Sequence, residues 1–149
     1  MLRPALIILF ILLWPLVNPA QTGYKETDSV KYTKSEIITN VNGFKTVTYY
    51  KGNNIRKIIR EFTGTGFSST TIYYIINDKL VHNVFVSLRS PNVYYEEHMY
   101  FNNGEMYKWV NSKDKEVNPF KDVFLEKEKL ALNFFEVDLK EAKTKKAGR

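Results

Sequence analysis

Three stretches between Tyr49 and Trp109 repeat one pattern and decide the fold. They read Tyr49-Tyr50-Lys51-Gly52-Asn53-Asn54-Ile55-Arg56-Lys57-Ile58, Tyr73-Tyr74-Ile75-Ile76-Asn77-Asp78-Lys79-Leu80-Val81-His82 and Met99-Tyr100-Phe101-Asn102-Asn103-Gly104-Glu105-Met106-Tyr107-Lys108-Trp109. Each copy joins an aromatic pair or its near equivalent to an Asn-bearing turn and an aliphatic residue. Successive copies begin 24 to 26 residues apart. That step is expected when each copy forms one β-hairpin with its return connection.

Turn signals continue on both sides of these copies at intervals of 10 to 13 residues, the spacing of an antiparallel meander. Asn42-Gly43 and Asn103-Gly104 are the strongest, because a type I′ hairpin turn needs positive φ at both central residues. The expected strands are Glu36–Val41, Phe44–Tyr50, Ile55–Phe62, Phe67–Ile76, Leu80–Arg89, Val93–Phe101 and Glu105–Asn111.

The central strands carry apolar side chains on both faces. Ile72 to Ile76 and Val84 to Val86 run without the alternation typical of a sheet with one solvated face. Either the sheet closes into an up-and-down barrel, or both faces are covered. Arg56, Lys57 and Arg60 interrupt their strand and place it nearer an edge or a solvated face.

The period changes at Asn118-Pro119, a good N-cap followed by a residue favoured at the first helical position. An amphipathic helix is predicted over residues 119–143, from Pro119 to Lys143, and a basic tail follows it. Leu residues seven apart, with their apolar neighbours, are expected to form its apolar stripe. Phe134 and Val137 lie beside this stripe and are either part of it or exposed. The stripe residues are Leu125, Leu132, Leu139, Phe135 and Ala142, widened by Phe124 and Ala131.

Residues 1–20 have the organisation of a secretory signal peptide. Arg3 supplies the positive charge, Ala5 to Trp14 is an unbroken apolar run, and Pro15 breaks it. Cleavage is predicted after Ala20, so residues 21–149 form a single secreted or periplasmic domain. The alternative, an uncleaved anchor, is disfavoured because the apolar run is too short to span ~30 Å of hydrocarbon. No stable transmembrane anchor is therefore expected.

The composition narrows the function classes. The 149 residues carry 22 Lys and Arg against 16 Asp and Glu, for a net charge of +6. This surplus is too modest to predict nucleic-acid binding. The sequence has no Cys, which excludes disulfides, thiolate metal sites and a Cys nucleophile.

No catalytic or cofactor-binding constellation stands out. Glu96 and His98 point the same way in a strand, but one His and one Glu are too few ligands for a zinc site. If Asn103-Gly104 is a two-residue hairpin turn, Tyr100 faces Tyr107 and His98 faces Trp109; a Gly added to the loop would reverse these pairings. We therefore expect no enzyme, no cofactor and no metal. The candidate binding surface comprises Tyr100, Tyr107, Trp109, His98, Arg56 and Arg60.

The hairpin units, Tyr-Tyr-x-x-Asn-x-Ile/Leu-x-Lys and Tyr-Phe-Asn-Asn-Gly-Glu-Met-Tyr-Lys, resemble those of MORN-variant, antitoxin-type repeat proteins. They are also similar to small exported β-meander proteins of unknown function in Gram-negative bacteria. The similarity covers about Phe44 to Val110. It implies an extended antiparallel sheet and a role in binding, and carries no functional residue over.

The sequence thus predicts an α+β fold: a curved seven-stranded antiparallel meander, with a closed barrel as the alternative, and a C-terminal amphipathic helix. One apolar face of the sheet is expected to close on itself or to receive a partner or ligand. The predicted function is an exported, non-enzymatic protein that presents an aromatic-rich sheet surface to a protein partner. The alternative is a carrier that holds a hydrophobic ligand between sheet and helix.

Overall fold

The computed structural model describes residues 33–38, 43–89 and 93–147. The predicted signal peptide, residues 1–20, lies outside them. Six strands make up the body of an antiparallel sheet, and β1 pairs along the outer edge of β2. The elements are β1 (Thr33–Ile38), β2 (Phe44–Lys51), β3 (Asn54–Gly64), β4 (Phe67–Ile76), β5 (Lys79–Arg89), β6 (Val93–Asn102), β7 (Glu105–Val110) and α2 (Asp122–Ala147).

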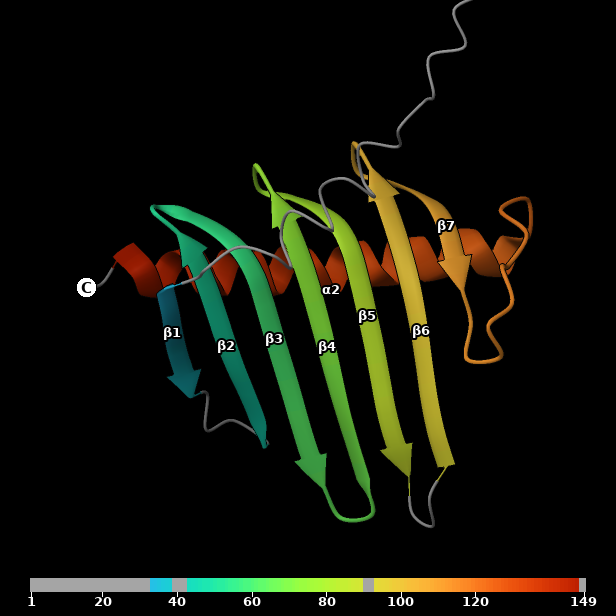
Figure 1. The fold of residues 1–149 in the computed structure, drawn as a ribbon, viewed down its shortest axis with the longest axis horizontal. Coiled ribbons are helices and arrows are strands. Elements are labelled where there is room, and N and C mark those ends of the chain that lie inside the picture. The colour runs from blue at the N-terminus through green and yellow to red at the C-terminus, as the bar shows by residue number, and fades with distance from the viewer. Residues whose placement is uncertain (1–32, 39–42, 90–92, 148–149) are drawn as a thin grey trace, which may run out of the picture.

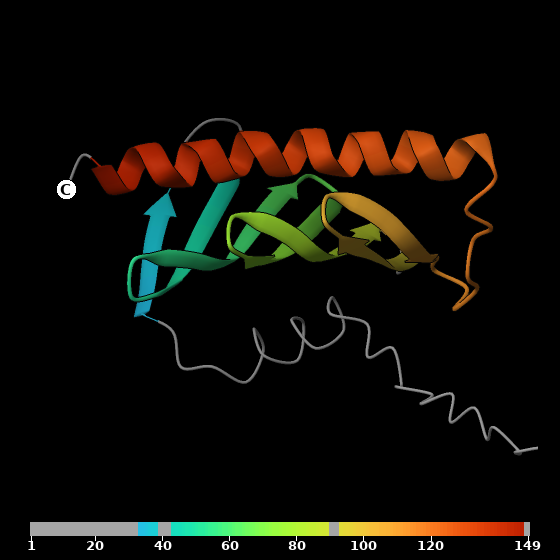
Figure 2. The ribbon, with the colours of Figure 1, turned by 90° about the horizontal axis from the view of Figure 1, so that it is seen from above.

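The strands are hydrogen-bonded in chain order, so the sheet is a meander, and α2 lies across the strands on one face (Figures 1 and 2). The predicted α+β arrangement, an antiparallel meander with a C-terminal helix, is confirmed. The alternative of a closed barrel is wrong, since the strand order ends at β1 and β7 without joining them. The expected first strand, Glu36–Val41, is confirmed in part: β1 begins three residues earlier, at Thr33, and includes Glu36 to Ile38, while residues 39–41 lie outside the described residues.

Each of the three sequence repeats is a two-residue turn followed by a β-bulge. The turns Asn77-Asp78 and Asn103-Gly104 have positive φ at both residues, as type I′ turns require. Register then shifts between Tyr49 and Tyr50, between Tyr74 and Ile75, and between Tyr100 and Phe101. The extra residues on the returning strands are Arg56, Val81 and Tyr107.

The bulges determine which face receives the side chains next to each turn. Side chains alternate between faces along a strand, and one extra residue reverses that alternation. On each returning strand the side chain between turn and bulge is therefore moved to the helix side, opposite a residue of the preceding strand that already faces the helix. These buried residues are Tyr50, Ile55, Ile75, Leu80, Phe101 and Met106.

The helix begins three residues later than predicted and ends four residues later. The Oδ1 atom of Asn118 accepts a hydrogen bond from the Phe120 N–H (2.9 Å), and the Asn118 carbonyl accepts one from the Lys121 N–H (3.2 Å). Asn118 to Lys121 is thus a turn that precedes the helix. Asp122 then lies in the first helical turn, where a negative charge complements the helix dipole.

The buried stripe of α2 consists of Phe124, Ala131, Phe135, Leu139 and Ala142. The expectation that Leu125 belongs to it is wrong, because Leu125 is 49% exposed. A seven-residue repeat drifts by about 20° per heptad around a straight helix. Leu139 is consequently buried, Leu132 is half-buried, and Leu125 has turned out of the interface.

Three contacts join the hairpin turns to one flank of α2. The Nζ atom of Lys146 donates to the Asn53 carbonyl (2.7 Å), and that of Lys143 pairs with Asp78 (2.7 Å). At the third hairpin the Met106 N–H donates to Oε1 of Glu128 (2.6 Å). The helix therefore covers the turn end of the sheet, and the opposite end of the same face extends beyond it.

The bulges make a prediction about stability. Deleting Val81 restores regular pairing, so either Leu80 leaves the core or His82 leaves the opposite face. Loss of one such buried side chain costs roughly 1.5–3 kcal/mol. Urea denaturation should show at least this loss, while Val81→Ala, which keeps the extra residue, should cost under about 1 kcal/mol. Equal stability of the two variants would show that the bulge does not set the register.

Candidate binding groove

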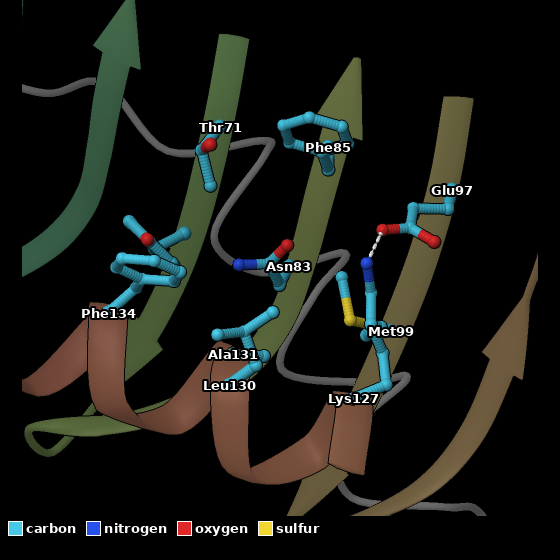
Figure 3. Close-up of a pocket in the computed structure, with 10 residues that line it drawn as sticks. Thr71, Asn83, Phe85, Glu97, Met99, Lys127, Leu130, Ala131 and Phe134 are labelled. Atoms are coloured by element: carbon cyan, nitrogen blue, oxygen red, sulfur yellow. Dashed lines mark ion pairs between the residues drawn. The ribbon is translucent and has the colours of Figure 1, made fainter. Parts of the chain in front are cut away.

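A groove lies between α2 and the part of the sheet that α2 leaves uncovered. At its deepest point is a pocket of about 230 Å³ whose helix wall is formed by Lys127, Leu130, Ala131 and Phe134 (Figure 3). The floor comes from three central strands and comprises Thr71, Tyr73, Asn83, Phe85, Glu97 and Met99. Leu130 is 50% exposed and Phe134 is 53% exposed, so both side chains are open to a ligand.

Glu97 is the charged centre of this region. It is fully buried, and its carboxylate pairs with Lys127 Nζ. The same carboxylate accepts hydrogen bonds from Trp109 Nε1 (3.0 Å) and from the Tyr95 hydroxyl (2.8 Å). Burial, aided by the bond to Glu97, raises the pKa of Tyr95 to about 12, so this hydroxyl remains a donor at physiological pH.

Lys127 links α2 to the sheet through its ammonium group, which pairs with Glu97 and lies near two aromatic rings. Its Nζ atom lies 5.8 Å from the ring centroid of Phe85 and 5.7 Å from that of Trp109, within the range of cation–π attraction. The Phe124 ring packs against Trp109 at 6.4 Å on the other side. Three donors thus surround the Glu97 carboxylate, and two aromatic rings lie beside Lys127 Nζ.

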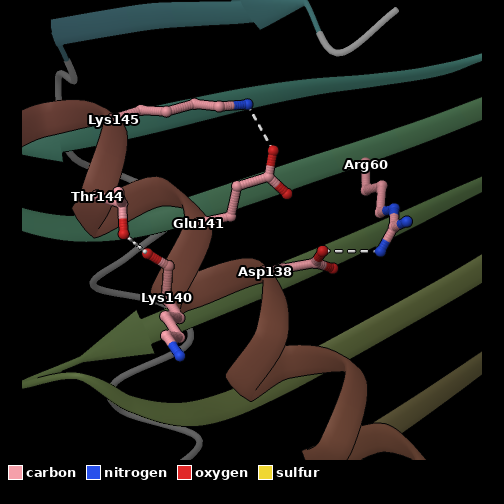
Figure 4. Close-up of polar contacts among 6 residues, drawn as sticks. All are labelled: Arg60, Asp138, Lys140, Glu141, Thr144 and Lys145. Carbon is pink, nitrogen blue, oxygen red and sulfur yellow. Dashed lines mark hydrogen bonds and ion pairs between the residues drawn. The ribbon is translucent and has the colours of Figure 1, made fainter. Parts of the chain in front are cut away.

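A second ion pair crosses from helix to sheet at Arg60 and Asp138. Arg60 Nη1 donates to Oδ1 of Asp138 at 2.7 Å, and Asp138 is almost fully buried (Figure 4). Burial raises the pKa of Asp138 although the Arg60 charge opposes the shift. Burial also raises the pKa of Tyr73, and Asp138 adds to that increase. One turn further along, the Thr144 hydroxyl donates to the Lys140 carbonyl and Lys145 pairs with Glu141 (Figure 4).

The structure separates the six residues expected to form one binding surface. Trp109 is in the core on the helix face, 8% exposed. His98 and Tyr100 lie on the opposite face, where their rings stack with His82. Arg60 is held by Asp138, and Arg56 and Tyr107 occupy equivalent bulge positions, with Arg56 buried.

The predicted pairings at the third hairpin are wrong. Tyr100 pairs with Lys108 and His98 with Val110, while Trp109 pairs with Met99. The Tyr107 bulge is the extra residue that reverses the faces. Of the two expectations for Arg60, an edge or a solvated face, the edge is wrong: Arg60 is on the interior strand β3, where Asp138 of α2 supplies its counter-charge.

The groove was missed by sequence analysis, although Phe134 and Val137 had been noted beside the apolar stripe. Floor residues such as Thr71 and Glu97 look like ordinary strand residues until α2 is placed above them. The signal that was present is the repeat of exposed apolar residues along one side of the helix.

On the other face, histidines and a carboxylate form a hydrogen-bonded chain. His82 Nε2 and His98 Nδ1 are 3.2 Å apart, and His98 Nε2 lies 3.0 Å from Oε1 of Glu96. The Tyr94 hydroxyl donates to Oε2 of Glu96, and this bond is the largest contribution to the lowered pKa of Glu96. Among the described residues, no three His, Asp or Glu side chains gather as a metal-binding group.

Burial, reinforced by the nearby His98, lowers the pKa of His82 to about 3. The unfolded chain should bind a proton at His82 with a pKa near 6.5, so its neutral form stabilises the fold above that pH. Between pH 6.5 and 5, stability should fall by up to about 1.4 kcal/mol per pH unit. Urea denaturation of the wild type and of His82→Phe across this pH range isolates the contribution of His82, because all other groups titrate in both proteins. Parallel pH profiles would contradict it.

Within residues 33–38, 43–89 and 93–147, no helix is long and apolar enough to cross a bilayer.

The resemblance to hairpin-repeat proteins is not tested by comparison with known proteins. No protein-family model, no curated protein and no solved structure matches this chain.

Proposed function

We propose that this chain is an exported, non-enzymatic binding protein that receives a segment of a protein partner in the groove beside α2. One observation carries the proposal: Leu130 and Phe134 are half exposed above a pocket at the boundary between the part of the sheet that α2 covers and the part that it leaves uncovered. Exposed apolar side chains grouped beside a concave surface are typical of interaction sites.

The pocket suits one anchoring side chain of a partner. Its floor and wall are mainly apolar, and Thr71 and Asn83 add polar groups that can fix an orientation. Binding energy at protein interfaces is concentrated in a few large side chains that enter such pockets. An aromatic or branched aliphatic side chain therefore matches the site.

The alternative function, a carrier of a hydrophobic ligand, is less well supported. A volume of about 230 Å³ is below the roughly 300–1,000 Å³ usual for small-molecule sites. The Glu97–Lys127 ion pair also lines this space, on its β6 side (Figure 3). A lipid chain would have to lie along charged groups there, whereas a protein segment can place polar atoms beside them.

The proposed binding surface differs from the six residues first expected. Trp109 is buried beneath the groove, where its Nε1–H donates a hydrogen bond to the Glu97 carboxylate and helps to hold it in place. Arg60 lies on the floor side of α2, where Asp138 holds it. His98 and Tyr100 face away from the groove and play no part in this proposal.

Site-specific photo-crosslinking tests the groove. A benzoylphenylalanine in place of Phe134 should crosslink a protein in the producing cell. The same residue in place of Leu125 should not, because Leu125 is equally exposed but lies on the other flank of α2. Equal crosslinking at both positions would contradict the proposal. A lipid-mass adduct in native mass spectrometry that Phe134→Asp removes would favour the carrier instead.

Export is the second part of the proposal and rests on the leader-like residues 1–20. Mass spectrometry of the native protein should find Gln21, cyclised or not, at the N-terminus. An Ala20→Arg variant, which spoils the small residue before the cut, should retain a longer N-terminus. Recovery of the wild type with intact Met1 in the cytosolic fraction would refute export by this route.

A further inference from the structure

The helix has a second apolar stripe, which its own sheet does not cover. Val123, Leu130 and Val137 are seven residues apart and are 48%, 50% and 61% exposed, with Phe134 between the last two. Such a heptad is the pattern by which one helix packs alongside another. The stripe runs along the flank that carries Lys127, Leu130 and Phe134, and therefore faces the uncovered floor.

The floor has room for one more helix. Side chains on one face of a strand are spaced by two residues, about 7 Å. Beside the row under α2, which includes Tyr73 and Met99, lie two further rows on the same face. On β4, β5 and β6 they are Thr71, Phe85 and Glu97, then Ser69, Ser87 and Tyr95. On β3 and β2 the same rows continue with Arg60 and Thr46, then Phe62 and Phe44. Neighbouring helices pack with axes 8–10 Å apart, so these rows accommodate a single helix beside α2.

The chemistry of the floor selects the kind of helix. Over β4 to β6, Ser69, Ser87, Thr71 and Tyr95 are half-buried and offer hydroxyl groups, so the surface resting on this part of the floor should be polar. At the β3 and β2 end, the outer row is aromatic, with half-buried Phe62 and Phe44. The neighbouring flank of α2 is apolar. The occupant therefore needs an apolar flank and a polar back, and α2 has both. Its exposed back carries Glu126, Asn133 and Lys140, again seven residues apart.

We propose that the occupant of the groove is α2 of a second copy of this chain. The inference rests on the proposed function, since it names the protein partner. A two-fold axis between the helices and parallel to them places each α2 on the other copy's floor, with the two sheets outermost. Any two-fold axis perpendicular to the sheet leaves both helices on the same side and cannot do so. The two helices then run parallel.

Parallel helices about this axis bring each stripe residue against its own equivalent, Leu130 against Leu130 and Val137 against Val137. A flank as long as α2, about 39 Å for 26 residues, together with the floor rows buries on the order of 600 Å² per copy. The total, about 1,200 Å², reaches the lower limit of stable interfaces. The interface is isologous, as closed dimers require.

Engineered cysteines test this arrangement directly, because the chain has no cysteine of its own. In the mature protein, Leu130→Cys and Val137→Cys should each form an intermolecular disulfide on mild oxidation, since parallel packing brings equivalent Cα atoms near the 4.4–6.8 Å a disulfide needs. Leu125→Cys, the matched control on the opposite flank, should remain monomeric. Light scattering should give a dimer for the wild type. Leu130→Asp should raise the dimer dissociation constant at least tenfold, with an unchanged circular dichroism spectrum.

Three results would overturn the inference. Disulfide formation at only one of Leu130 and Val137 would indicate crossed or antiparallel helices. A dimer that Leu130→Asp leaves intact would place the interface elsewhere. A wild-type monomer at all concentrations would exclude the second copy, and the crosslink from position 134 to a foreign protein would then decide the proposed function separately.

Discussion

The bulged hairpin is the constraint on which the rest of this structure depends. Three times along the chain, a two-residue turn is followed by one extra residue on the returning strand: Arg56, Val81 or Tyr107. Each extra residue turns the apolar side chains next to the turn toward the helix. Bulges also bend the strand and increase its twist. The three turns reach the same flank of α2 and contact it through Lys146, Lys143 and Glu128.

Two buried ion pairs fix where α2 lies across the strands. Glu97 with Lys127 and Asp138 with Arg60 join helix to sheet at points about three helical turns apart. Burying such charges gives little net stability, yet separating a buried pair is costly. A shift of α2 by one turn would leave Glu97 and Asp138 buried without their cations. We interpret the pairs as devices that fix the register of the helix.

The groove follows from this one-sided attachment. Because every turn contact is on one flank of α2, the helix covers the turn end of the sheet and leaves the far rows uncovered. Its other flank, with Leu130 and Phe134, consequently has no cover from its own sheet among the described residues. The proposed binding therefore depends on an imbalance in the fold: the helix exposes apolar surface, the floor over β4 to β6 exposes hydroxyl groups, and space for one helix lies between them.

The sequence by itself determined the local structure. Asn-Gly and Asn-Asp pairs specify turns through their tolerance of positive φ, and the spacing of those turns specifies a meander with a helix after it. Only the tertiary structure decided on which face of the sheet or helix each side chain lies. The Tyr107 bulge placed Trp109 in the core and His98 on the opposite side, and the drift of the Leu125 heptad left that residue exposed. A one-residue shift costs little locally but reverses every side chain beyond it, so packing against α2 selects the register and with it the groove.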